Sequence, residues 1–200
     1  DGTGTSNFNV NPGGSFAGIA SGSRITLQAT NNISVLSPFN VTTATGGNTG
    51  VSVTLQANNA IAINAAVTTA GTGNITLIAD NDGNGVGAIS RTSAGTLNTG
   101  AGGSVTLSAG SGLNAAVSSP SVIVSNANGG VVTVTNANVG GAVSLGNVAA
   151  SGLTVTTSNG AITQTGAMNV STGTAAFNAG TAGDITLDSR ANDFGTATFT

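Results

Sequence analysis

Short runs in which aliphatic residues alternate with Thr or Ser recur along the whole chain. The clearest of them is Gly73-Asn74-Ile75-Thr76-Leu77-Ile78-Ala79. Related runs begin at Arg24, Ser52, Ser104, Ala142 and Asp184. Alternation with a period of two is typical of a β-strand that buries one face and exposes the other. The aliphatic residues of each run would therefore point into a core, and the Thr and Ser residues would face solvent.

The recurrence of one strand motif predicts coils that stack on one another. A single strand cannot bury its apolar face alone, whereas stacked copies share one continuous core. The candidate core residues are Ile25, Leu27, Ile33, Val53, Leu55, Ile61, Ile75, Leu77, Val105, Leu107, Leu113, Ile185 and Leu187.

Each coil would contain a first strand, a tight corner, a second strand and a looser return. Residues 30–32 and 58–60 are rich in Asn, which tolerates the backbone conformations of tight corners and could stack from coil to coil. A third inward position would follow at Val41, Val67 and Val117.

The number of coils follows from the uneven spacing of the motif leucines, which we interpret as coils of roughly 20–25 residues, some with inserted loops. The intervals 107–145 and 145–187 are each long enough for two coils. The total is then about 8–10 coils, and at ~4.8 Å per layer they would form a rod of roughly 40–50 Å. The sequence predicts one all-β domain over residues 1–200, an elongated parallel β-helix (β-solenoid). Residues 22–200 would form the regular coils, and 1–21 an irregular first coil or the continuation of upstream coils.

The composition agrees with a thin rod. Only 4% of the residues are charged and 3% are aromatic, whereas a usual charged fraction is about 25%. So few large side chains could hardly fill the thick core of a globule. An antiparallel sandwich of short strands is the main alternative, but it gives no reason for one string to recur with Thr always outside.

Charge and residue usage exclude several classes of function. The net charge is −3 and Lys is absent, which argues against nucleic acid and anionic membranes as partners. No apolar run approaches the ~20 residues of a membrane span. His, Cys, Lys and Glu are all missing, so we expect no enzyme. Asp184 and Asp188, near Arg190, would lie ~13 Å apart on one strand, too far for a retaining glycosidase pair.

One loop has the spacing of a calcium site. Residues 80–85 match the first half of a calcium-binding loop, in which alternate oxygens from Asp80, Asp82 and Asn84 would face one Ca²⁺ ion. The second half does not match, because Arg91 takes the place of the bidentate Glu. The alternative is a corner held by hydrogen bonds between side chains and backbone.

An outward rank of hydroxyl side chains suggests a different class, an ice-binding face. The rank is Thr26, Thr54, Thr76, Thr106, Ser144 and Thr186. Such a face needs two parallel Thr ranks, and the neighbouring outward positions are occupied by Gln28, Gln56, Ile78, Ser108 and Asp188. Thr also favours strands for reasons of packing alone, and this second explanation is the preferred one.

The runs at 25–35 and 73–77, together with the closing residues 191–196, resemble the repeat region of filamentous-haemagglutinin-like exoproteins. These are large bacterial adhesins of the two-partner secretion and autotransporter type. The resemblance implies a right-handed parallel β-helix, export across a Gram-negative outer membrane to the cell surface, and a role as an extracellular fibre or adhesin stalk in cell adhesion or biofilm. No secretion domain or receptor-binding tip of that family is recognisable.

Partners follow from the same interpretation. A solenoid without caps presents unpaired strand edges, so further coils of the same chain or neighbouring copies would stack end to end. Host or matrix receptors, or polysaccharide, would be further partners of an adhesin. A polysaccharide-binding or polysaccharide-degrading β-helix remains the other alternative to a stalk.

The position of Leu77 gives a direct test of the inward pattern. Substitution Leu77→Asp should unfold or fray the rod, because a lone buried carboxylate finds no partner. Circular dichroism and thermal melting measure the loss, and an unchanged melting curve would place Leu77 outside the core.

Overall fold

The computed structural model describes residues 8–10, 19–41, 50–126, 129–188 and 191–200. Its strands are β1 Phe8–Val10, β2 Arg24–Ala29, β3 Ile33–Val35, β4 Phe39–Asn40, β5 Ser52–Ala57, β6 Ile61–Ile63, β7 Val67–Thr68, β8 Ile75–Ala79, β9 Ala88–Arg91, β10 Leu97–Asn98, β11 Ser104–Ala109, β12 Gly112–Ser118, β13 Ser121–Asn126, β14 Val131–Val139, β15 Ala142–Ala149, β16 Gly152–Ser158, β17 Ile162–Gln164, β18 Met168–Asn178 and β19 Asp193–Phe199. Within these ranges no helix is long and apolar enough to cross a membrane.

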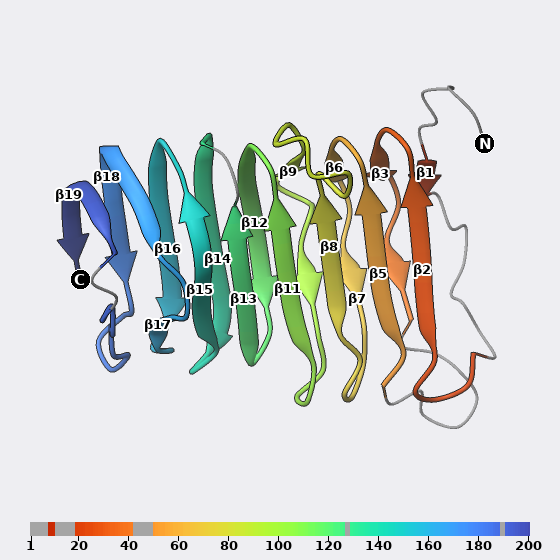
Figure 1. Ribbon diagram of the computed structural model, residues 1–200. Helices are drawn as coiled ribbons and strands as arrows, with labels where there is room; N and C mark the ends of the chain where they lie inside the picture. The colour runs from red at the N-terminus through yellow and green to blue at the C-terminus, as the bar shows by residue number, and fades with distance from the viewer. Residues whose placement is uncertain (1–7, 11–18, 42–49, 127–128, 189–190) are drawn as a thin grey trace.

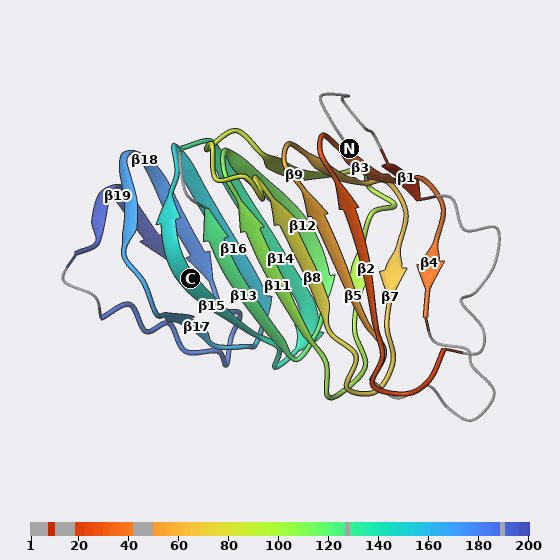
Figure 2. The same cartoon turned by 45° about the vertical axis from the view of Figure 1, so that its right-hand side comes forward.

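The strands form one 19-stranded sheet that winds as a right-handed parallel β-helix. In Figure 1, β5, β8 and β11 rise side by side, and the chain passes behind them before each new coil begins. This right-handed path is the usual one for crossovers between parallel strands. The same stack is seen turned by 45° in Figure 2. Among the described strands each recorded pairing is parallel, for example β5 with β8 and β14 with β16, which rules out the antiparallel sandwich.

Two long ladders make up most of the rod. The first ladder is β2, β5, β8, β11, β13, β15 and β17, followed by the bridge between Ile162 and Ile185. The second ladder is β1, β3, β6, β9, β12, β14, β16, β18 and β19. Eight and nine rungs respectively agree with the predicted coil number. A short third ladder contains β4, β7 and β10 and ends on β12.

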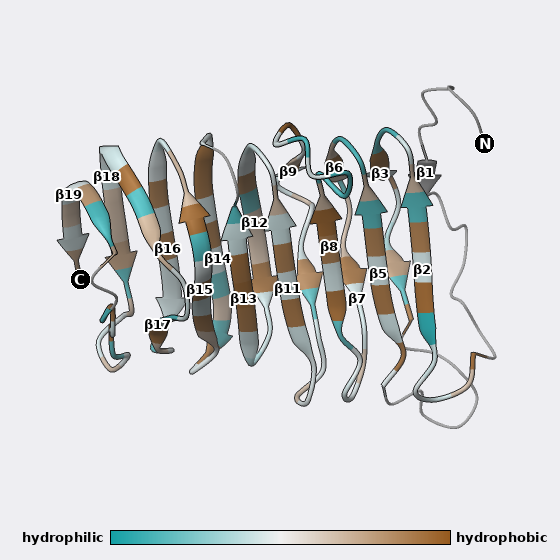
Figure 3. Cartoon of the chain, viewed as in Figure 1, coloured by the Kyte–Doolittle hydropathy of each residue, from teal (hydrophilic) through white to brown (hydrophobic). Residues whose placement is uncertain are grey.

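The alternating pattern places the core as predicted. Figure 3 shows the hydrophobic and hydrophilic bands that cross the strands. Ile75 and Leu77 are fully buried between equivalent residues of the neighbouring coils. Ile25, Leu27, Ile185 and Leu187 are only partly buried. The remaining candidate core residues are buried: Ile33, Val53, Leu55, Ile61, Val105, Leu107 and Leu113.

The third inward position differs from the prediction in the first coil. The register aligns Phe39, not Val41, with Val67 and Leu97. Val41 is also buried, one inward position further along. The corner from Val35 to Phe39 has the same length as the corner from Ile63 to Val67. The prediction therefore missed Phe39 because it chose the next aliphatic residue of the alternation, Val41, and not because the strand is shifted.

Asn side chains form hydrogen bonds from coil to coil at the corners, as expected. Asn59 Nδ2 donates to Asn31 Oδ1 at 3.2 Å, and the Ala60 N–H donates to Asn32 Oδ1 at 3.0 Å. These bonds join one coil to the next outside the strands.

The Thr and Ser residues of the recurring motif face outward as predicted, but some polar residues outside the motif are buried. The buried polar residues are Thr69, Ser119, Asn126, Asn136 and Thr157. Thr69 Oγ1 donates to Gly73 O at 2.7 Å, and Thr157 Oγ1 donates to Gly160 O at 2.6 Å. A buried hydroxyl is tolerated there because it satisfies a carbonyl of the corner that leads into the next first strand.

A column of glycines stands at that same corner, two residues before the first inward residue of the strand. A Cβ added at Gly73 would lie 2.3 Å from Val51 O. A Cβ at Gly103 would lie 2.3 Å from Gly73 O, and one at Gly160 would lie 2.0 Å from the carbonyl oxygen of Gly141. Backbone therefore packs on backbone here, and only glycine allows the coils to approach so closely.

We expect Gly103→Ala to lower the free energy of unfolding by roughly 1–3 kcal/mol, the usual range for overpacking. The matched control is Gly152→Ala, because a Cβ at Gly152 meets nothing within 4 Å. Denaturant unfolding followed by circular dichroism compares the two, and equal stabilities would show that the corner yields without strain.

Candidate functional site

The predicted calcium ligands lie together in the corner between β8 and β9. Asp80 is half-buried and has a positive φ of 69°, whereas Asp82 and Asn84 are exposed. The Gly85 N–H donates to Asp80 Oδ1 at 2.9 Å. Asn84 Nδ2 donates to Asp82 Oδ2 at 2.9 Å, and the Val86 N–H donates to Asn84 Oδ1 at 2.9 Å. The bonds from the Gly85 and Val86 N–H groups are the side-chain-to-backbone bonds expected if this loop is a tight corner and not a calcium site.

This donor set fits a cation only in part. Asp80 Oδ2 and Asp82 Oδ1 have no hydrogen bond within the described residues. Calcium takes about 6–8 oxygen ligands, so water would have to supply most of them. Over the described ranges, no three Asp, Glu, His or Cys side chains gather into a metal-binding group. Calcium binding at Asp80, Asp82 and Asn84 stays a prediction.

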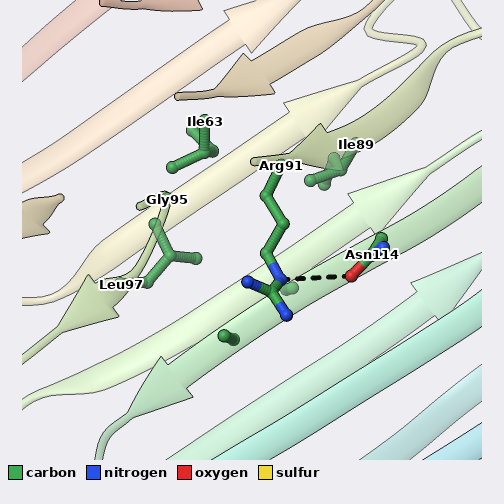
Figure 4. A pocket seen from close by; sticks show the side chains of 8 residues that line it. Ile63, Ile89, Arg91, Gly95, Leu97 and Asn114 are labelled. Carbon is green, nitrogen blue, oxygen red and sulfur yellow. Dashed lines mark hydrogen bonds between the residues drawn. The ribbon is translucent and has the colours of Figure 1, made fainter. Parts of the chain in front are cut away.

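Arg91 is not part of this loop. It lies on β9 at an inward register position, paired with Ile63. Figure 4 shows its side chain leaving the core and crossing to β12, where Nε donates to Asn114 Oδ1 at 3.2 Å. Burying an unpaired guanidinium would be costly, so the side chain turns away from the core and pairs with the exposed Asn114. The space between Arg91, Ile89 and Leu97 has no room for a water molecule, so it is no ligand pocket.

The two carboxylates considered for catalysis lie on the last rung of the first ladder. Asp184 and Asp188 are both exposed, and the Ile162 N–H donates to the backbone oxygen of Asp184 at 2.8 Å. Arg190 lies outside the described residues. The structure brings no further titratable group to them among the residues that it describes.

The predicted hydroxyl rank is aligned as expected. Thr26, Thr54, Thr76 and Thr106 pair in register along the first ladder. Ile123 then interrupts the rank and is 45% exposed. An unbroken hydroxyl array is therefore absent from this face.

A second set of Thr residues was missed. Thr133 pairs with Thr154, and Thr135 pairs with Thr156, which gives two adjacent ranks on the second ladder. The hydroxyl rank predicted from the sequence contains only residues of the first strand of each coil, so these Thr residues are not part of it. The strings 132–135 and 153–156, each an aliphatic-Thr alternation, were the available signal.

Comparison with protein-family models gives a match in the C-terminal part of the chain. A family model described as "Repeats of unknown function (DUF5649)" matches residues 129–200. No curated protein and no solved structure matches the chain. The matched segment begins just before β14 and contains the C-terminal coils of the rod, so that this part of the chain is similar to a family of repeats.

The calcium prediction is tested by calorimetry of the whole chain at millimolar Ca²⁺. Weak binding should be seen in the wild type and lost in Asp82→Asn, whose carboxylate takes no part in a backbone bond. The exposed Asp188→Asn substitution, which lies in the last coil, is the control. If the wild type gives no heat of binding, the prediction that Ca²⁺ binds at this loop is wrong.

Proposed function

We propose that the chain is a non-enzymatic structural protein, a rigid stalk segment of an extracellular bacterial fibre or adhesin. The observation that supports this most is the unbroken stack of parallel rungs over one aliphatic core, from β1 to β19. The ladder hydrogen bonds run along the rod axis, so a pull on the axis is shared by all bonds of a layer. Such a rod holds its two ends apart under load.

The end rungs support assembly with further coils or with neighbouring copies. Phe199 on β19 is 57% exposed and stacks on Phe177 with ring centroids 5.5 Å apart. At the other end, Ile25 and Leu27 on β2 are only partly buried. Strand edges with partly exposed core residues readily accept another parallel rung.

Charge complementarity favours the same arrangement. Arg24 stands on β2, and Asp184 stands in the same outward column at the opposite end of the first ladder. A rung added beyond Asp184 with a basic residue in this column would form a cross-strand ion pair. The resemblance of the repeats to filamentous-haemagglutinin-like exoproteins supports the surface location and the role in adhesion or biofilm.

Negative-stain electron microscopy of the purified chain at several concentrations tests the stalk. We expect straight rods, or fibres of constant width that lengthen with concentration. Compact round particles would contradict the proposal.

The role of the end rungs is tested with one variant pair. Phe199→Asp places a charge on the open end of the core and should shorten any fibres. Val139→Asp is the control. Val139 is 77% exposed, but it belongs to β14, which lies in the interior of the stack and not at one of its ends. Fibres of equal length in both variants would show that β19 is not the contact surface.

A further inference from the structure

A groove runs along the edge of the second ladder in the C-terminal half of the rod. Its volume is about 440 Å³. The residues that line it come from β14, β16 and the corners that follow β16 and β18: Thr135, Asn136, Ala137, Thr156, Thr157, Ser158, Asn159, Gly180 and Thr181. Equivalent positions of successive coils form its wall, since Thr135 pairs with Thr156 and Asn136 pairs with Thr157. The groove therefore follows the axis of the rod.

The floor of the groove is fixed by hydrogen bonds within the protein. Asn136 and Thr157 are buried. Asn136 Nδ2 donates to Ser119 O at 2.9 Å, and Asn136 Oδ1 accepts the Asn138 N–H at 3.1 Å. These side chains are occupied, so the floor is preformed and needs no rearrangement to receive a ligand.

The rim carries hydrogen-bonding groups that remain available. The hydroxyls of Thr135, Thr156 and Ser158 form no hydrogen bond within the described residues. Asn159, with a positive φ of 60°, is held in place because its Oδ1 accepts the Thr181 N–H at 2.9 Å. Among the described residues, no acceptor takes a hydrogen bond from the side-chain nitrogen Nδ2 of Asn159. This nitrogen can therefore donate to a ligand.

Further hydroxyls extend this rim over the neighbouring face. Thr133 pairs with Thr154 two residues earlier on the same outward face, and Thr174 on β18, the next rung, pairs with Thr196 on β19. The rungs repeat every ~4.8 Å, close to the length of one sugar unit in an extended polysaccharide. The columns of Thr133 and Thr135 continue with Thr154 and Thr156 on β16, with Ala176 and Asn178 on β18 and with Thr198 on β19. A polymer that lies along the rod would therefore meet at least one hydrogen-bonding side chain on each of these rungs.

We propose that this hydroxyl groove binds a neutral polysaccharide laid along the rod axis. None of the residues that line it is charged, and the chain as a whole has a net charge of −3, so a polyanion would gain no ion pair and meet repulsion. The groove offers no aromatic or large aliphatic anchor for a peptide side chain. Each contact is weak, and a long polymer gains its affinity from many rungs at once.

The same surface fits ice less well. Ala176 and Asn178 occupy positions that would continue the two Thr ranks on β18, so the array is irregular. A crystal plane needs a regular partner, whereas a flexible chain adapts to an irregular one.

The test is binding of the whole 200-residue chain to soluble polysaccharides in affinity electrophoresis and calorimetry. The probes are neutral dextran, galactomannan and β-glucan, with alginate and polygalacturonate as acidic counterparts. We expect at least one neutral polymer to bind. The double substitution Thr135→Val and Thr156→Val, which removes two hydroxyls at nearly constant volume, should weaken binding roughly tenfold.

Two controls separate the groove from the rest of the surface. Thr54→Val with Thr76→Val makes the same change on a registered pair of the first ladder and should leave binding unchanged. Thr135→Ser with Thr156→Ser keeps both hydroxyls and should bind like the wild type. Should the valine pair reduce the melting temperature, Ala137→Leu narrows the groove from an exposed rim position and should also weaken binding.

Several results would overturn the proposal: no binding of any neutral polymer, binding of acidic polymers alone, or equal affinity in the groove and first-ladder variants. Thermal hysteresis without polysaccharide binding would assign the surface to ice instead. The proposal rests on the surface of a single chain and goes beyond the stalk function. Rods in the microscope without any bound polysaccharide would therefore reject the groove and keep the stalk.

Discussion

The hydrogen-bonded register between parallel strands is the constraint on which the rest of this structure depends. Each strand pairs with the equivalent strand of the coil before and the coil after it, so residues at equivalent positions stack in columns. Leu55, Leu77 and Leu107 share one inward column and are fully buried. Because residues of similar type recur along an inward column, each side chain packs on a similar one of the next coil. A thin core of Val, Ile, Leu and Ala can therefore replace the thick core of a globule.

Register also explains why unusual residues are confined to corners. Glycines such as Gly73 and Gly103 are required where the carbonyl of one coil faces the backbone of the next. Buried hydroxyls of Thr69 and Thr157 satisfy carbonyls at the same turn. Arg91 is the exception, because its register position points inward and its charge forces the side chain out to Asn114. The coils therefore differ from one another more in their corners than in their strands.

A rod of this kind separates two tasks. Stiffness comes from the ladders and the core, which occupy the inward positions. Outward positions are free to vary, and on this chain they are nearly uncharged. The groove beside β14 and β16 combines a preformed floor with free hydroxyls. Under the two proposals made above, the stalk would carry a polysaccharide along its side without a separate binding domain. Repetition along the axis compensates for the weakness of each contact.

The sequence by itself determined the strand motif, the inward residues such as Ile75 and Leu77, the parallel coils and their approximate number, because a period of two and its recurrence are local properties of the chain. It also located the loop at Asp80, whose own hydrogen bonds are short in range. Only the tertiary structure decided that Asn136 is buried and that Thr135 and Thr156 share a groove. These relations depend on the exact length of each corner. A shift of one residue in a corner changes every partner in the following strand, and no local pattern records which residue the next coil will place beside it.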